Sequence, residues 1–279
     1  MRKSGKSSKD LKMIDYKKDN EIKIMQEGGL ILTEIMNLLL DRARVGVSMI
    51  ELDRLAEKEI IQRGGEPSFK KVPGYKWSIC ACVNEVVVHG IPDNYQIKAG
   101  DAVGIDCGVY YNGFHTDASW TVRVGSGSQD GALDRFLASG RKALTSALKE
   151  VVPGNYIYDV SKAIQTEVES AGYSVVKSLI GHGVGRSLHE EPEIPGFTRG
   201  QREDTVMIKP GLVAAVEVIY NMGGADVVYK GNDGWTIKTK DDKISGLFEA
   251  TVGVSNHGVL LLTKINGTSG NNRENRPGN

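Results

Sequence analysis

Residues 104–117 read Gly104-Ile-Asp-Cys-Gly-Val-Tyr-Tyr-Asn-Gly-Phe-His-Thr-Asp117, and this stretch decides the fold. The Asn112-Gly113 dipeptide between two largely apolar runs is the strongest short signal of a tight turn joining antiparallel strands. We therefore expect a β-hairpin here. A hairpin places Asp106 and Asp117 on neighbouring strands, within reach of one ion.

The same apolar pattern recurs about 110 residues later in the chain. Lys98–Asp106 resembles Lys209–Glu217, and Gly46–Gly64 resembles Gly154–Gly172 at nearly the same offset. The repeat predicts two halves with the same helix–helix–strand order, related by a pseudo-twofold axis, with one carboxylate from each half facing that axis. Because the self-similarity is weak, chance is the alternative explanation.

The remaining periodicity predicts an α+β fold. Helices are expected at 21–44, 49–63, 131–150 and 158–171, and strands at 78–88, 102–107, 116–124, 213–219 and 249–254. Ser48 and Glu51 form a capping box before the second helix, and Gly64 closes it. We expect a basic flexible arm at 1–16, one domain at 17–265 with halves near 17–125 and 126–265, and a flexible tail at 266–279.

Composition excludes several classes of protein. The 279 residues include 35 Lys+Arg and 35 Asp+Glu, and a net charge of zero argues against a dedicated nucleic-acid binder. No apolar run reaches the roughly 18–20 residues of a membrane helix. Three cysteines, Cys80, Cys82 and Cys107, without CxxC spacing argue against a disulfide framework or a structural zinc site, and favour a reducing cytoplasm.

Three carboxylates interrupt apolar runs. Asp106 and Glu217 stand inside predicted buried strands, and Glu249 stands in Leu247-Phe-Glu-Ala-Thr251. Burying a charge costs several kcal/mol unless it is paired or binds a metal. The alternative is a carboxylate on a solvated strand face, which the apolar residues on both sides disfavour.

Histidines complete a set of metal-binding residue types. His182 lies between Gly181 and Gly183, which let the backbone approach a ligand; His189 follows it, and His89 ends a strand. The candidate ligands are Asp106, Asp117, His182, Glu217 and Glu249. Four carboxylates match the charge of two divalent cations, and this donor set suits Mn, Fe, Co or Zn.

These stretches, in this order and spacing, resemble the type I methionine aminopeptidases of peptidase family M24, which have the pita-bread fold. The matching segments are Val83–Pro92, Gly104–Gly108, Gly113–Asp117, Gly181–Pro192 and Trp235–Thr239, and the resemblance runs from about Lys17 to Lys264. The short separation of His182 and Glu217 leaves no room for the helical insertion of type II enzymes.

The resemblance implies a role for each matching residue. It implies the five candidate ligands as holders of two divalent ions, with Asp106 and Glu249 bridging or bidentate. It implies that His89 contacts the substrate amide or amine, that His189 steadies the scissile carbonyl, and that Glu217 carries the proton. It also implies Tyr75, Cys80 and Trp235 as parts of the pocket for the methionine side chain. His115, two residues before Asp117, is expected at the cleft rim.

The implied reaction is removal of the initiator methionine from nascent chains, with a preference for small second residues. We expect a cytoplasmic monomer that binds neither DNA nor membranes. The basic arm is expected to be a solvated tail, with transient ribosome contact as the alternative. Two rival functions stay open, an Xaa-Pro aminopeptidase of the same fold and a pita-bread binding protein with little catalytic activity.

Three positions depart from the pattern of the family. Val218 stands where proline is usual, Ala250 where histidine is usual, and Trp120 where lysine or arginine is common. None removes a candidate ligand. We expect them to affect metal preference or rate through the residues that orient the ligands.

Overall fold

The computed structural model describes residues 13–125 and 131–266. Except for residues 13–16 and 266, the expected N-terminal arm and C-terminal tail lie outside this range.

Four helices form where the sequence predicts them. They are α1 (Asp19–Arg42), α2 (Met49–Gln62), α3 (Ala132–Glu150) and α4 (Ile157–Ser170). The start of α2 has the predicted cap, because the backbone N–H of Ser48 donates to the Glu51 carboxylate at 2.7 Å. Gly64 follows the helix with φ +79°, a conformation that glycine adopts without strain.

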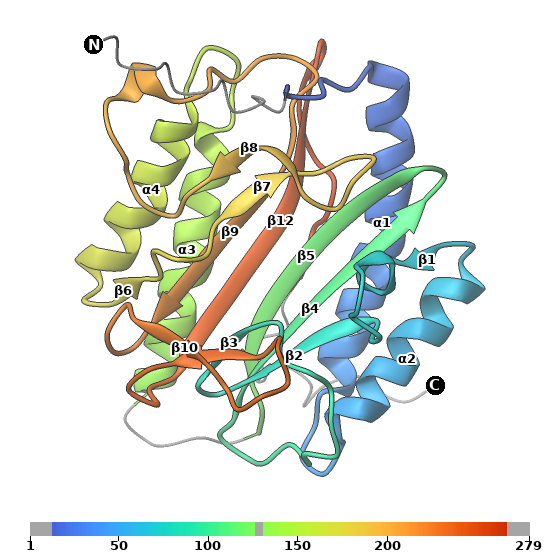
Figure 1. Ribbon diagram of the computed structural model, residues 1–279, viewed down its shortest axis with the longest axis vertical. Helices are drawn as coiled ribbons and strands as arrows, with labels where there is room; N and C mark the ends of the chain where they lie inside the picture. The colour runs from blue at the N-terminus through green and yellow to red at the C-terminus, as the bar shows by residue number, and fades with distance from the viewer. Residues whose placement is uncertain (1–12, 126–130, 267–279) are drawn as a thin grey trace, which may run out of the picture.

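One large antiparallel sheet runs through the molecule (Figure 1). The strands are β1 (Glu66–Pro67), β2 (Ile79–Val83), β3 (Val86–Val88), β4 (Ala102–Tyr111), β5 (Phe114–Arg123), β6 (Ser174–Val175), β7 (Gly181–Gly183), β8 (Glu190–Ile194), β9 (Val213–Asn221), β10 (Val227–Tyr229), β11 (Ile237–Thr239), β12 (Ser245–Ser255) and β13 (Gly258–Leu261). Short 3-10 helices cover Phe69–Lys71 and Arg202–Asp204. The main path of the sheet is β1-β4-β5-β12-β9-β7-β8, and β10, β11 and β3 form a second, three-stranded sheet.

The hairpin that the sequence predicts is present between β4 and β5. Tyr111 pairs with Phe114 across the turn, and Asn112 and Gly113 have φ of 46° and 94°. Both dihedrals are positive, as a tight hairpin turn of this kind requires. In the resulting register Asp117 lies opposite Gly108, two positions along from Asp106, so the two aspartates share one face of the sheet.

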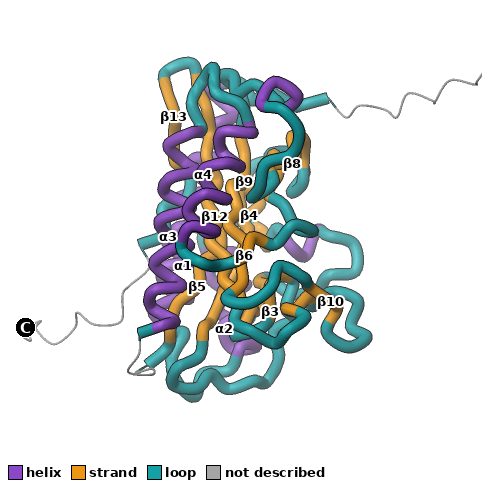
Figure 2. Tube along the Cα trace, turned by 90° about the vertical axis from the view of Figure 1, so that its left-hand side faces the viewer, coloured by secondary structure: helices purple, strands orange, loops and turns teal. Residues whose placement is uncertain are grey.

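Helices cover only one face of the large sheet. In Figure 2, α1, α3 and α4 lie on one side of the long strands, and β3, β8 and β10 lie on the other with several loops. Buried side chains of α1 and α2 pack with those of β4, and buried side chains of α3 and α4 pack with those of β9 and β12. Each half therefore has its own apolar core, and the fold is the expected pita-bread arrangement.

The predicted strand at 78–88 is wrong in one respect, because it is two strands. Residues 84 and 85 turn the chain between β2 and β3, and Asn84 has φ 53°. The Asn84 side chain stabilises this turn by donating to Asp101 at 2.9 Å and accepting from the backbone N–H of Ala102 at 3.0 Å. Asparagine tolerates this conformation better than most residues.

Cys80, Cys82 and Cys107 are buried and form no disulfide. Among the described residues, no helix combines the length and the apolar character that crossing a membrane requires.

Candidate metal centre

The site lies where the two central strands of the sheet separate. Within the described residues, the ladder between β5 and β12 has one register pair, Trp120 with Phe248. On one side of this pair, the Thr251 hydroxyl accepts from the N–H of Asp117 at 2.9 Å and donates to its carbonyl at 2.7 Å. On the other side, Thr121 makes the same two bonds to Leu247, at 3.0 and 2.9 Å.

The two threonines therefore take the place of direct strand-to-strand hydrogen bonds. Each hydroxyl satisfies both polar groups of one residue on the facing strand, so the strands stay joined although they lie too far apart for a regular ladder. Thr121 lies four residues after Asp117, and Thr251 lies two residues after Glu249, so both threonines face the same side of the sheet as the carboxylates.

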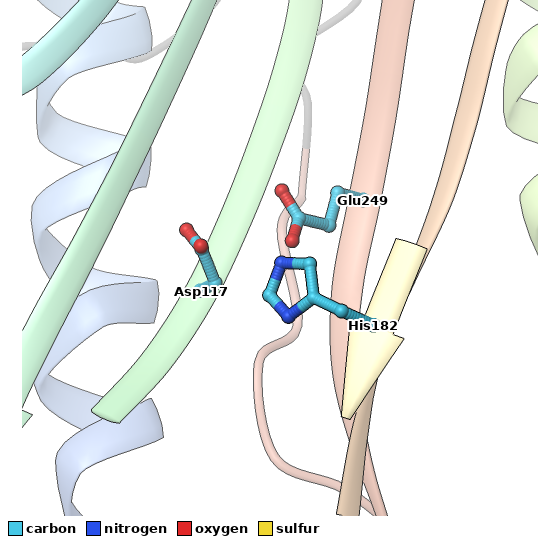
Figure 3. Close-up of side chains that lie close together, drawn as sticks. All are labelled: Asp117, His182 and Glu249. Atoms are coloured by element: carbon cyan, nitrogen blue, oxygen red, sulfur yellow. The ribbon is translucent and has the colours of Figure 1, made fainter. Parts of the chain in front are cut away.

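Three donors from three strands converge beside this gap. Asp117 on β5, His182 on β7 and Glu249 on β12 offer ligand atoms that all lie within 4.8 Å of one another (Figure 3). Glu217 pairs with Glu249 across β9 and β12, and its carboxylate lies 3.4 Å from His182 Nε2. Asp106 lies on the same face of the sheet as Asp117, and its charge helps to raise the pKa of Asp117, Glu217 and Glu249, so it lies close to this group. Three of the five side chains singled out by the sequence therefore form one tight cluster, and the other two, Asp106 and Glu217, border it.

Burial gives these carboxyls unusual acid–base properties. It raises the pKa of Asp106 to about 7. Burial, and after it the charges of neighbouring carboxylates, also raises the pKa of Asp117, Glu217 and Glu249 well above its usual range. Two oxygens, Asp106 Oδ1 and Glu249 Oε1, are buried with no hydrogen-bond partner. Such groups need a counter-charge, and a divalent cation bound among them would provide it.

His182 is held in the form that binds metals. Its Nδ1 lies 2.9 Å from the carbonyl of Gly183, which can only accept, so Nδ1 carries the proton. The lone pair is then on Nε2, the nitrogen near the Glu217 carboxylate. Burial, and secondarily the charge of His189, lowers the pKa of His182 to about 3, so the ring is neutral at physiological pH. The donor set therefore fits divalent cations that accept nitrogen and oxygen.

Two further histidines border the carboxylates. The His189 ring packs edge-on against His182 with ring centroids 4.3 Å apart. Burial lowers the pKa of His189, and burial together with the charge of His189 lowers the pKa of His89. His89 has φ 54°, an uncommon backbone conformation for a residue other than glycine. Two neutral imidazoles therefore stand ready to donate or accept hydrogen bonds.

The residues assigned to a side-chain pocket also lie together. Tyr75, Cys80 and Trp235 belong to one apolar cluster with Phe69 and Leu188. The Tyr75 and Trp235 rings meet edge-on with centroids 5.1 Å apart, and the Tyr75 hydroxyl donates to the carbonyl of Ile79 at 2.8 Å. Cys80 pairs with Asp106 across β2 and β4, so this cluster directly adjoins the carboxylates.

His115, expected at the cleft rim, is instead buried. Its Nδ1 shares a 2.7 Å hydrogen bond with Ser68 Oγ, and its ring lies tilted against that of Tyr110 with centroids 4.7 Å apart. Its backbone N–H donates to the carbonyl of Gly185 at 2.7 Å. Burial lowers the pKa of His115 to about 4. His115 therefore supports the loop that follows His182.

Known proteins similar to this chain include metallopeptidases, in agreement with a metal centre at this place. The family model described as metallopeptidase family M24 matches residues 23–255. The chain belongs to metallopeptidase family M24. It is 42% identical to a methionine aminopeptidase of Clostridium perfringens over 91% of this chain and all of that one, and 40% identical to methionine aminopeptidase 1 of Bacillus subtilis with the same coverage.

Solved structures give the same result. A methionine aminopeptidase of Thermotoga maritima superposes with a TM-score of 0.84 at 35% identity, over 90% of this chain and all of that chain. A prolidase of Pyrococcus furiosus superposes with a TM-score of 0.71 at 21% identity, and 65% of that longer chain is covered. The second likeness shows the shared fold alone.

The three departures from the usual M24 pattern face away from the site. Val218 and Ala250 each follow a site carboxylate, so strand alternation turns them to the helix-covered face, where both are buried in the core formed with α3 and α4. Trp120 packs edge-on against Phe248 of the same core, with ring centroids 5.0 Å apart. The expected influence on the ligands is therefore indirect, through the packing of α3 on the sheet.

Proton competition predicts a pH-dependent effect of metal on this M24 chain. The raised pKa values mean that the carboxyls stabilise the metal-free fold at low pH, and that this stability is lost as pH rises through the raised values, about 7 for Asp106. Added Mn²⁺ should therefore raise the melting temperature more at pH 8 than at pH 6. Thermal scans of chelated and reloaded protein measure this. An equal increase at both pH values would contradict it.

Replacing the hydroxyl of Thr251 should loosen the site. Thr251→Val keeps the shape but leaves the buried N–H and carbonyl of Asp117 without a partner, which costs about 1–3 kcal/mol for each group. We expect lower stability in urea unfolding and Mn²⁺ affinity reduced about 10–100-fold in calorimetry. Thr251→Ser keeps the hydroxyl and is the matched control. Wild-type stability and Mn²⁺ affinity for the valine variant would show that the Thr251 hydroxyl does not maintain the separation of β5 and β12.

Proposed function

We propose that this chain is a methionine aminopeptidase that removes the initiator methionine from nascent polypeptides. The observation that carries the proposal is the cluster of Asp117, His182 and Glu249, bordered by the partly buried Asp106 and Glu217, in a chain that matches named methionine aminopeptidases over their whole length. M24 membership supports a metal-dependent hydrolase.

Two divalent ions per chain are proposed, held by Asp106, Asp117, His182, Glu217 and Glu249. The charge of the four carboxylates supports two ions rather than one, and the donor set admits Co, Mn, Fe or Zn. A divalent ion bound here polarises a carbonyl and brings the pKa of bound water near neutrality.

The side chains around the ligands are assigned separate tasks. Neutral His189, beside His182, donates a hydrogen bond to the scissile carbonyl oxygen as negative charge develops on it. His89, whose pKa burial and the charge of His189 lower, contacts the substrate amide or amine. Glu217, whose pKa burial raises, takes a proton from the attacking water and delivers it to the departing amine.

The apolar cluster beside Asp106 is proposed to bind the methionine side chain. Tyr75 and Trp235 offer aromatic edges and faces, and Cys80 offers a soft, polarisable atom, all of which suit a thioether. A preference for small second residues is proposed with it. Residues 17–265 are proposed to work as one domain in a cytoplasmic monomer, and transient contact of the basic arm with ribosomes stays the alternative to a solvated tail.

The two rival functions have less support. The Xaa-Pro hypothesis rests on structures at 18–22% identity whose chains are considerably longer than this one. A binding protein without activity would not need five ligand-type side chains at one buried place, and it would purify without a stoichiometric divalent ion.

The test is release of methionine from Met-Ala-Ser and Met-Leu-Ser after chelation and re-addition of each divalent ion. We expect metal-dependent release from the first peptide in clear excess over the second. Asp106→Ala should lower this activity by more than the roughly 10–100-fold typical of residues outside the ligand shell. Glu203→Ala, an exposed carboxylate outside the ligand set, is the control and should keep it. No release with any metal would overturn the proposal.

A further inference from the structure

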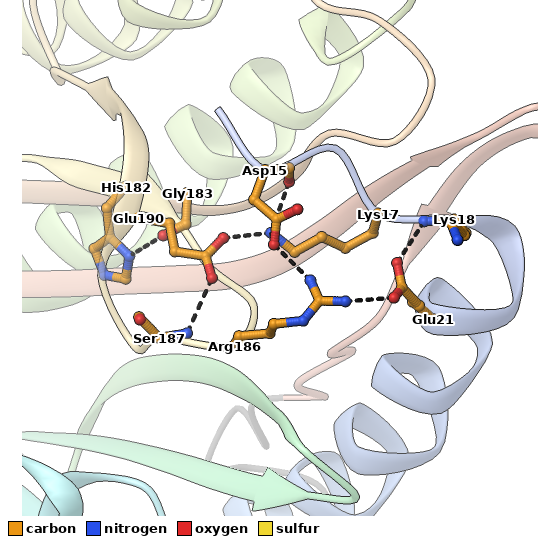
Figure 4. Close-up of polar contacts among 9 residues, drawn as sticks. All are labelled: Asp15, Lys17, Lys18, Glu21, His182, Gly183, Arg186, Ser187 and Glu190. Carbon is orange, nitrogen blue, oxygen red and sulfur yellow. Dashed lines mark hydrogen bonds and ion pairs between the residues drawn. The ribbon is translucent and has the colours of Figure 1, made fainter. Parts of the chain in front are cut away.

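The N-terminal strap, defined as residues 15–17, lies across the histidine loop, defined as residues 184–189 (Figure 4). The histidine loop joins β7, which carries His182, to β8, and it ends with His189. The backbone N–H of Lys17 fixes the strap to the sheet by donating to the carbonyl of Gly211 at 2.7 Å.

Lys17 reaches from the strap into the interior. Its side chain is 1% exposed, and its ammonium pairs with Glu190, the first residue after the histidine loop. It also donates to the carbonyl of Asp15 at 2.7 Å. A lysine ammonium is rarely buried to this extent unless it is paired.

Glu190 also contacts the histidine loop directly. Its second carboxylate oxygen accepts from the backbone N–H of Ser187 at 2.9 Å. The loop also packs directly on the lysine, because a Cβ added at Gly185 would overlap Lys17 Cε. Outside this buried pair, Arg186 pairs with Asp15 at 2.6 Å and with Glu21. The strap and the loop are therefore joined by one buried and one exposed set of ion pairs.

Both ends of the histidine loop lead to the metal centre. Gly183 accepts the hydrogen bond that fixes the tautomer of His182, and Gly183 also pairs with Glu190. At the other end, the His189 ring packs against His182. The shape of the loop thus fixes where the His189 imidazole stands relative to the ligands.

We propose that the buried Lys17–Glu190 pair is a positioning device that holds the histidine loop so that His189 meets the scissile carbonyl. The inference rests on the proposed function for the role of His189, whereas the holding of the loop does not. A buried ion pair adds little net stability compared with a neutral pair of similar size, so stability alone gives no reason for burying one here. The need to fix the geometry of the loop next to a reacting group does give such a reason.

The experiment compares the double variant Lys17→Met/Glu190→Gln with wild type and with Lys18→Met. The double variant removes both charges together, so no unpaired charge stays buried, and the carboxamide oxygen of the new glutamine can still accept from Ser187. Lys18 is the exposed neighbour in the sequence, and its side chain makes no cap hydrogen bond. The measurements are melting temperature, bound metal, kcat and KM for Met-Ala-Ser, and hydrogen–deuterium exchange of residues 184–189.

The expected result is a double variant with near-wild-type melting temperature and metal content, faster exchange in the histidine loop, and kcat lowered about 10–100-fold with KM within about twofold. Lys18→Met should match wild type in every measurement. A double variant with wild-type kcat and wild-type loop exchange overturns the proposal, because the pair would then serve folding alone.

Failure of the proposed function would be visible separately. Wild type would then release no methionine, and the exchange data alone would decide whether the strap holds the loop. Should the double variant not fold, Glu190→Gln alone takes its place, because it removes the buried pair while Lys17 keeps the Asp15 carboxylate 3.4 Å away as a partner. Faster loop exchange with lower kcat then supports the proposal, and wild-type values for both overturn it.

Discussion

Four carboxyls gathered in one place, two of them buried and two partly buried, are the constraint on which the rest of this structure depends. Left without a counter-charge, Asp106, Asp117, Glu217 and Glu249 repel one another, and their raised pKa values express burial together with that repulsion. The residues around the four carboxyls accommodate this concentration of charge. Threonine hydroxyls hold the two central strands apart while satisfying the backbone, and the neighbouring histidines are kept neutral by burial. Divalent cations complete the charge balance that the protein itself leaves open.

The fold separates this charged centre from the groups that stabilise the protein. Helices pack on one face of the sheet and supply two apolar cores, while the carboxyls face the other side, under loops and short strands. Strand alternation makes the division sharp, because Glu249 faces the site while Phe248 and Ala250 face α3. Unusual residues such as Trp120 are therefore accommodated in the core without displacing a ligand. The loops on the open face remain to shape the substrate site.

The sequence predicts the long elements well and the short ones poorly. The four helices have a clear apolar periodicity, the second also has a capping box at Ser48 and Glu51, and the β4–β5 hairpin has Asn112-Gly113. The strands β7 and β8 are short, and β7 is Gly-His-Gly, which has no strand pattern of its own and is a strand because it pairs with β8 and β9. Asp106, Glu217 and Glu249 stand out in the sequence because their charges interrupt apolar runs, whereas Asp117 is found through the hairpin and His182 through its flanking glycines. The roles of Thr251, Lys17 and Ser68 depend on contacts with residues far away in the chain, which no local pattern encodes.

The central claim is that the carboxyls, with His182, form one centre for two divalent cations. A crystal structure of Mn²⁺-loaded protein, with anomalous scattering measured at the manganese edge, tests it most directly. The account predicts two anomalous peaks beside the gap between β5 and β12, each within bonding distance of side chains among Asp106, Asp117, His182, Glu217 and Glu249. No peak at this place, or peaks bound by other residues, would contradict it.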